Sequence, residues 1–267
     1  MRVALFVPCY VDQLRPEVGL AALDVLEACG IEADFPEGQT CCGQPFLTAG
    51  ETARARALAG RFIDVFEGFD TIVSLSGSCA ATVARQFPLL APGSRGDEVA
   101  GRTREFCDFL ADHALAGDGE PDTPWGAFPH RVGLHSSCHA LRELGLGTPS
   151  ESRAPARPDP ARRLLESVAD LELVALERSD ECCGFGGIFA LEEEAVSCRM
   201  GLDRLEDHRR ARAELIASTD ISCLLHLAGV AEKNAFDFRT LHVAEVLAAA
   251  LPERDAREAH GVSDGPR

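Results

Sequence analysis

The hydrophobic positions of the first 90 residues alternate between short apolar runs and longer stretches in which apolar residues recur three or four positions apart. Runs of about 4–8 apolar residues are typical of buried strands, and the wider spacing predicts amphipathic helices. Strands are expected at 2–7, 31–35 and 71–75, and helices at 17–29, 51–69 and 80–90. Strands that alternate with helices predict an α/β fold with parallel sheets.

The second part of the chain repeats this order. Strands are expected at 131–135, 173–176 and 221–225, and helices at 160–169 and across 191–218. Glycine and proline are concentrated at 116–129, which is typical of a linker. We therefore expect two similar parallel-sheet α/β halves, with a first domain over 1–125 and a second over 126–252. The charged stretch 253–267 contains glycine and proline and is expected to be a flexible tail.

Each half contains one cysteine, then a Cys-Cys-Gly triplet, then a fourth cysteine. The eight residues are Cys9, Cys41, Cys42 and Cys79 in the first half, and Cys138, Cys182, Cys183 and Cys223 in the second. The stretches before and after the cysteine pair span 31 and 36 residues in the first half, against 43 and 39 in the second. Two copies of one pattern with loops of different length indicate an internal duplication. The remaining cysteines, Cys29, Cys107 and Cys198, lie within helical patterns and are expected to be small core residues.

The positions of these cysteines predict where they meet. In both halves the first cysteine follows a strand, and the last is expected at or near a strand end. The carboxyl ends of parallel strands are where α/β folds place ligands. Gly43 and Gly184 relax the backbone in the sharp loop that an adjacent cysteine pair needs. We expect the cysteines to gather at one rim of each sheet, with the two rims turned towards a shared cleft.

Four thiolates are the usual ligand set of an iron–sulfur cluster, so the eight cysteines predict one or two [4Fe–4S]-type clusters. Zinc also accepts four thiolates, but its structural sites generally draw them from short C-x-x-C pairs, which neither copy contains. Thr82 and His226 stand where such a pair would close, which makes His226 a further candidate for iron ligation or for a hydrogen bond to the cluster. His135 and His139 flank Cys138 and could donate to sulfur or relay protons.

Composition narrows the choice of partners and of compartment. The 267 residues carry a formal net charge of −17, which excludes nucleic acid because phosphate binding needs clusters of Lys and Arg. No stretch of about 18 apolar residues occurs, so membrane insertion is not expected. The N-terminus lacks the apolar region of a signal peptide, which favours the cytoplasm, where thiols stay reduced. The glycine-rich stretch 184–187 lacks the spacing of a dinucleotide-binding motif.

Six ordered blocks of the sequence resemble the lactate-utilization protein A family. They are VPCYVD at 7–12, FPEGQTCCGQP at 35–45, SGSC at 76–79, SCHALREL at 137–144, ECCGFGG at 181–187 and LHVAEVL at 241–247. The resemblance runs from residue 2 to residue 251. The doubled Cys-Cys-Gly arrangement is also similar to the cysteine-rich subunit of heterodisulfide reductase and to glycolate oxidase iron–sulfur subunits.

The resemblance implies an iron–sulfur subunit that transfers electrons in a complex oxidising L-lactate to pyruvate, together with two separately encoded partner subunits. Contact with the small 2-hydroxy acid would then be indirect, through a partner. The resemblance gives the ligand role to the same eight cysteines. Thr82 and His226 depart from the fifth cysteine of heterodisulfide reductase-like relatives.

Two alternatives remain open from the sequence. In one, the chain catalyses thiol–disulfide chemistry at a cluster, as the likeness to heterodisulfide reductase would allow. In the other, it is a zinc-stabilised scaffold that docks partner subunits. Whether the chain is itself an enzyme or a non-catalytic subunit of an oxidoreductase is also left open.

Overall fold

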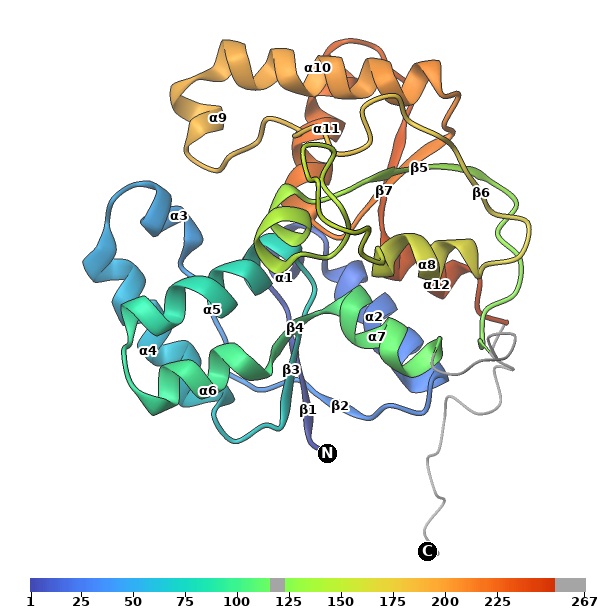
Figure 1. The fold of residues 1–267 in the computed structure, drawn as a ribbon. Helices are drawn as coiled ribbons and strands as arrows, with labels where there is room; N and C mark the ends of the chain where they lie inside the picture. Colours follow the sequence, from blue (N-terminus) through green and yellow to red (C-terminus); the bar gives the residue numbers. More distant parts are fainter. Residues whose placement is uncertain (116–122, 253–267) are drawn as a thin grey trace, which may run out of the picture.

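The computed structural model describes residues 1–115 and 123–252, and Figure 1 shows their arrangement. Part of the expected linker, 116–122, and the expected tail, 253–267, lie outside the described residues. Two four-stranded sheets are formed, one from each half of the chain, and every strand pair in both is parallel. The fold class is therefore confirmed: the protein consists of two similar α/β halves.

The first half forms its sheet in the order β2-β1-β3-β4. Its strands are β1 (Val3–Phe6), β2 (Ala33–Asp34), β3 (Thr71–Ser74) and β4 (Thr103–Glu105). Its helices are α1 (Cys9–Leu14), α2 (Pro16–Ala28), α3 (Gln44–Thr48), α4 (Thr52–Phe66), α5 (Gly77–Leu90), α6 (Ser94–Arg102) and α7 (Phe106–Ala114). All four residues of β1 are buried, as expected for a central strand of a parallel sheet.

The second half repeats this topology in the order β6-β5-β7-β8. Its strands are β5 (Arg131–His135), β6 (Glu172–Leu173), β7 (Leu215–Ser218) and β8 (Arg239–His242). Its helices are the π-helical turn η1 (Ala140–Leu144), α8 (Pro160–Glu166), α9 (Phe189–Glu192), α10 (Glu194–Arg210), α11 (Ile221–Lys233) and α12 (Val243–Ala249). The central strand β5 takes the place of β1, and β7 takes the place of β3, which agrees with an internal duplication.

One part of the expected order is wrong. The run 221–225, expected as a strand, is the first turn of α11, and the third strand of this half is β7, inside the stretch 191–218 that was expected to be helical. A short apolar run does not distinguish a buried strand from a buried helix. Asp220 decides the outcome, because its side chain accepts a hydrogen bond from the Ser222 amide and so begins a helix.

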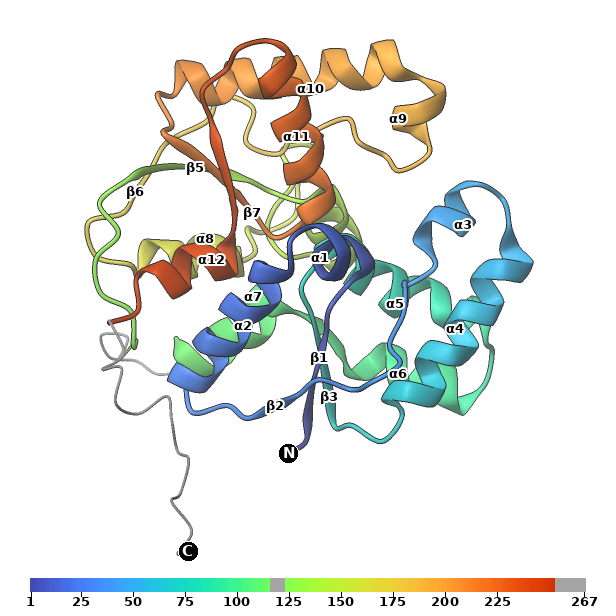
Figure 2. The same ribbon diagram turned by 180° about the vertical axis from the view of Figure 1, so that it is seen from behind.

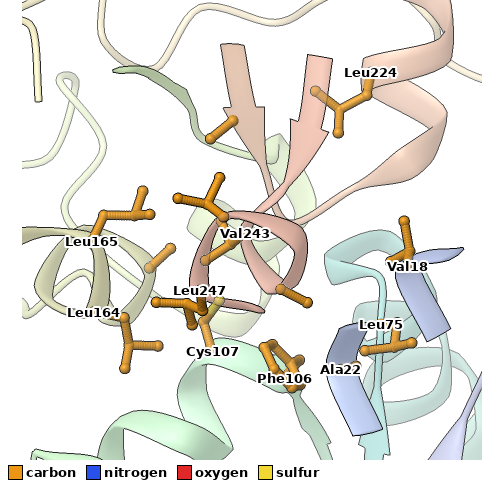
Figure 3. Packing of buried hydrophobic residues seen from close by; sticks show 14 of the residues in the cluster. Val18, Ala22, Leu75, Phe106, Cys107, Leu164, Leu165, Leu224, Val243 and Leu247 are labelled. Atoms are coloured by element: carbon orange, nitrogen blue, oxygen red, sulfur yellow. The ribbon is translucent and has the colours of Figure 1, made fainter. Parts of the chain in front are cut away.

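The main hydrophobic core runs across both halves. Figure 3 shows Val18 of α2 and Phe106 of α7 from the first half in one packed region with Leu164 of α8 and Val243 and Leu247 of α12 from the second. All five side chains are buried. A second, smaller core lies within the first half, between its sheet and α4, α5 and α6. Seen from behind, α1 lies at the junction of the halves, next to α11 (Figure 2).

Candidate metal centre

The eight cysteines of the two repeated patterns all line one cavity of about 320 Å³ between the two halves. Within residues 1–115 and 123–252, which contain every cysteine of the chain, none forms a disulfide. The expected shared cleft is therefore present, and the cysteines of both halves meet in it at the rims of their sheets. The three other cysteines do not line the cavity, and Cys107 is fully buried in the main core.

In the first half, four sulfur atoms form a continuous chain of contacts. Cys9 begins α1, Cys41 and Cys42 lie in the loop before α3, and Cys79 lies in the first turn of α5. The Sγ atoms of Cys42 and Cys79 are 3.3 Å apart. Cys41 accepts hydrogen bonds from Cys42 and Cys9, so the four thiols are joined in the order 9, 41, 42, 79. We call these residues the first quartet.

The second half repeats the arrangement with Cys138, Cys182, Cys183 and Cys223, which we call the second quartet. Cys182 accepts hydrogen bonds from Cys138 and Cys183, and Cys183 also interacts with Cys223. Cys138 follows β5, and Cys223 lies in the first turn of α11 rather than near a strand end. The two quartets thus present the same four sulfur positions from equivalent elements.

Each quartet favours one thiolate. Hydrogen bonds from Cys42 and Cys9 lower the pKa of Cys41 to about 3, and those from Cys138 and Cys183 lower the pKa of Cys182 to about 2. The thiols that donate, above all Cys42 and Cys183, have their pKa raised by this donation and by burial. A thiolate is the form of cysteine that binds metal, so these hydrogen bonds favour the binding form at Cys41 and Cys182.

Two glycines shape the loops that hold these thiolates. Gly43 has φ of +87° and Gly184 has φ of +92°, a left-handed conformation that favours glycine. Their amides donate to the sulfur atoms of Cys41 and Cys182, at 3.4 Å in both cases. The expected role of glycine in these loops is thus confirmed, and the same turn also supplies an N–H donor to each thiolate.

The N-termini of α5 and α11 line the cleft. The Ser76 side chain accepts from the Cys79 amide at 3.3 Å and caps α5. Asp220 caps α11 and also accepts from the Ser78 amide at 2.8 Å and from the Ser137 hydroxyl at 3.3 Å. One buried carboxylate therefore joins both helix starts, and the positive ends of both helix dipoles lie beside cysteines.

Comparisons with known proteins agree with this geometry. A family model described as a cysteine-rich domain, CCG, matches residues 3–84 and 132–228. Lactate utilization protein A 2 of Bacillus cereus (strain AH820) is 33% identical over 256 residues, which cover 94% of this chain and 99% of the relative. The chain belongs to the lactate utilization protein A family. Another member, lactate utilization protein A of Bacillus velezensis, is 35% identical over 253 residues, covering 92% of this chain and 99% of the relative.

A solved glutamate racemase from Bacillus anthracis covers 93% of this chain and 79% of its own, with 11% identity and a TM-score of 0.35, a likeness too weak to bear on the site. No helix among the described residues of this lactate utilization protein A family member is long and apolar enough to cross a membrane.

The three candidate histidines of this family member have different surroundings, and Nδ1 of His139 lies 3.5 Å from the Cys138 Sγ atom. His226 Nε2 is 3.3 Å from the Ser197 carbonyl oxygen, and ligation through that atom would require this contact to break. His135 instead lies with Cys183 and Cys223 in a group whose ligand atoms are all within 4.8 Å of one another. Burial, and then the charge of Arg204, lower the pKa of His135 to about 3, so its ring is neutral. Sequence reasoning missed Arg204, because no local pattern links it to a residue 69 positions earlier.

The residues of this family member fit an iron–sulfur group. Eight thiols in two quartets that line one cavity supply the donor set of two four-thiolate clusters. Amide donors to sulfur come from Gly43, Gly184 and Phe185. Such hydrogen bonds are a usual means of tuning a cluster. This chain thus gathers eight cysteines in one cleft, an arrangement that suits a metal or a cluster.

Proposed function

We propose that this chain holds a [4Fe–4S]-type cluster on each cysteine quartet and serves as the electron-transfer subunit of a complex that oxidises L-lactate to pyruvate. The observation that carries the proposal is that both quartets line one cavity between the halves. The relatives named lactate utilization protein A supply the link to lactate. When bound, such a cluster supplies one-electron redox chemistry.

The residues around the quartets would support this role by balancing charge. Thiolate ligands make the cleft strongly negative, and the N-termini of α5 and α11 offset part of that charge. The amides of Gly43 and Gly184 donate to the thiolates of Cys41 and Cys182. These contacts favour the deprotonated form of the ligands, which metal binding requires.

The cleft is poorly suited to hold lactate itself. Of the described residues that line the cavity, none is Lys or Arg, and Asp220 adds a negative charge to the cysteines. A 2-hydroxy acid is an anion at neutral pH and needs a cationic partner such as arginine. We therefore assign oxidation of lactate to a partner, in an assembly with two further subunits, and electron transfer to this chain.

We assign the protein to the cytoplasm. All eleven cysteines are free in the structure. Thiols in that number stay reduced most readily in the cytoplasm, where glutathione and thioredoxin act.

The first test is the metal and acid-labile sulfide content of protein purified without oxygen, with EPR spectra before and after dithionite. We expect about eight iron atoms per protein chain, an equal amount of sulfide and an EPR signal that changes on reduction. Stoichiometric zinc without sulfide would contradict it and support the scaffold alternative. Loss of a disulfide substrate in the presence of the reduced protein alone would support the thiol–disulfide alternative.

A paired substitution tests whether each quartet binds its own cluster. Cys42→Ser and Cys183→Ser remove one buried sulfur from equivalent positions, and each variant should lose about half of the iron. Cys198→Ser is the control, because Cys198 lies on α10 outside the cavity. This variant should keep all of its iron. Loss of all iron from either cavity variant, with the fold intact by circular dichroism, would indicate one shared cluster instead.

A further inference from the structure

The two halves differ at one set of equivalent positions behind the quartets. Phe6 of β1 pairs with Ser74, and His135 of β5 pairs with Ser218, so Phe6 and His135 are equivalent. A Cβ on Gly43 would contact Ala55 and Leu58 of α4, whereas one on Gly184 would contact Ser197 and Met200 of α10. Ser197 lies 142 positions after Ala55, and Met200 lies 142 positions after Leu58. Equivalent residues of α4 and α10 are therefore 142 positions apart in the sequence. This offset places Arg204 at the position of Phe62 and His208 at that of Phe66.

In the first half these positions form an aromatic group. Phe6 and Phe62 meet edge to face at 4.9 Å between ring centroids, and Phe62 stacks on Phe66 at 4.3 Å. All three rings are buried in the same apolar cluster as Cys42 and Cys79. The first quartet is therefore backed by an apolar surface whose phenylalanine rings offer no N–H or O–H donor.

In the second half the same positions are polar and equally buried. Arg204 is 0% exposed, and its Nε donates to His135 Nδ1 at 3.1 Å. Its Nη1 makes an ion pair with Asp207 at 3.1 Å. Gly133 leaves room for the His208 ring, because a Cβ at Gly133 would overlap His208 Nδ1. The second half thus accommodates these polar side chains through a glycine on β5.

The contact with Arg204 fixes the role of the His135 ring. Arginine only donates hydrogen bonds, so Nδ1 of His135 must be the acceptor, and the proton of the neutral ring is on Nε2. A protonated Nε2 does not bind iron. It can donate to sulfur, and one ring nitrogen of His135 lies within 4.8 Å of the Sγ atoms of Cys183 and Cys223.

The fold does not require polar residues at these positions, because the first half fills them with apolar rings. Buried ion pairs often stabilise a protein no more than apolar residues of similar volume do. The first half shows that three aromatic rings fill the same positions of this fold. Arg204 and Asp207 also hydrogen-bond the backbone of residues 177–179. His135, at the position of Phe6, is therefore the polar residue that calls for a role beyond packing.

We infer that His135, held by Arg204, raises the reduction potential of a cluster on the second quartet above that of a cluster on the first quartet. This inference rests on the proposed function. Reduction makes a cluster more negative, and an N–H donor polarised by a buried guanidinium stabilises the added charge. The aromatic surroundings of the first quartet give no such stabilisation. An electron supplied to the protein then resides mainly in the second half.

Single-cluster variants test the order of the two potentials. Cys183→Ser leaves the first cluster, Cys42→Ser leaves the second, and each is titrated with dithionite against redox mediators while EPR follows reduction. The second cluster should be favoured at least tenfold, which is about 59 mV for a one-electron couple. Equal midpoints, or a higher midpoint for the first cluster, would overturn the inference.

Substitution of His135 tests whether its ring causes the difference between the two midpoint potentials. In the Cys42→Ser background, His135→Phe copies Phe6 and should lower the midpoint by about 59 mV, a tenfold loss. His135→Gln keeps an N–H donor and should restore most of the shift. His208→Phe, which copies Phe66, is the packing control and should leave the midpoint unchanged. A shift of equal size in His208→Phe, or none in a cluster-bearing His135→Phe, would overturn the assigned role.

The outcomes separate this inference from the proposal on which it rests. Absence of iron and sulfide from the wild-type protein contradicts the proposed function. Bound iron with coincident midpoints contradicts only the inference. The comparison of the two single-cluster variants leaves His135 in place, so it decides the order of potentials even where His135→Phe loses its cluster.

Discussion

Gly43 and Gly184 occupy equivalent positions, yet a side chain would meet different surroundings at each. A Cβ on Gly43 would lie 3.6 Å from Ala55, an ordinary van der Waals contact. A Cβ on Gly184 would lie 2.6 Å from the Ser197 carbonyl oxygen and 2.7 Å from the Met200 Cβ. Backbone on α10 blocks the second position, and this difference can be measured.

We predict that Gly184→Ala destabilises the protein more than Gly43→Ala does. Both variants impose a left-handed alanine, which costs about 1–2 kcal/mol. Gly184→Ala must also displace α10, which adds about 1–3 kcal/mol. The measurement is urea unfolding of both variants beside wild type, followed by circular dichroism. Equal losses of unfolding free energy would show that the α10 contact relaxes without cost.

Glu105 is a buried carboxyl group outside the cleft lining. It is 2% exposed, its Oε2 accepts from the Asp108 amide at 3.1 Å, and its Oε1 has no partner among the described residues. Burial raises its pKa to about 8, and hydrogen bonds from the Cys107 and Asp108 amides offset only part of that rise. The native protein therefore keeps this proton at neutral pH.

The raised pKa of Glu105 predicts a stability that falls as pH rises. Between the unfolded pKa near 4.5 and the folded pKa of about 8, the unfolded chain releases the proton and the native chain keeps it. Stability is then lost at roughly 1.4 kcal/mol per pH unit. Glu105→Gln should remove this slope and be more stable than wild type at pH 8, with little difference near pH 4.5. Urea unfolding at several pH values measures it.

Asp112→Asn provides the control for this pH series, because Asp112 lies on α7, the helix that Glu105 caps, and its side chain is 64% exposed. It should follow the wild-type curve. If the wild-type and Glu105→Gln curves ran parallel from pH 4.5 to 8, Glu105 would not be the protonated group.

At the scale of elements, α2 shows how one helix face joins the halves. Leu26 is 0% exposed and belongs to the core shared with α12, whereas Leu20 of the same helix is 65% exposed. Leu26→Ala should cost about 2–5 kcal/mol of unfolding free energy. Leu20→Ala should change it by about 0.5 kcal/mol or less. Thermal or urea unfolding of the pair checks the difference, and similar losses would contradict the orientation of α2.

Periodicity predicted the alternation of elements because buried strands and amphipathic helices have different spacings. It failed at 221–225, where the apolar residues of a buried helix start look like those of a strand. The cysteine pattern predicted the shared cleft, because each quartet follows elements of the same repeat. Arg204 and its contact with His135 were not predictable, since the residues meet only through the packing of α10 on β5.

At the scale of the whole molecule, polar contacts join the repeats around the cleft. The Gly77 amide donates to the Thr219 carbonyl oxygen at 3.1 Å, and the Ser78 amide donates to Asp220. Arg15, between α1 and α2, makes a half-buried ion pair with Glu245 of α12 at 3.0 Å. The loops and helices around either quartet are thus held in place by contacts between the two halves. The boundary near residue 125 separates the two repeats in sequence, and its status as a domain boundary stays a prediction.

The shared core makes the folding of the two repeats interdependent, and we predict one cooperative unfolding transition for the full chain. Trp125, the single tryptophan, is 5% exposed and donates to the Ser167 hydroxyl at 3.0 Å, so its fluorescence reports on the junction. Far-UV circular dichroism reports on helices of both halves. The two urea curves should coincide, as in two-state unfolding. Separate midpoints would instead show two domains with independent stabilities, because the core between α2, α7, α8 and α12 would then contribute too little to couple them.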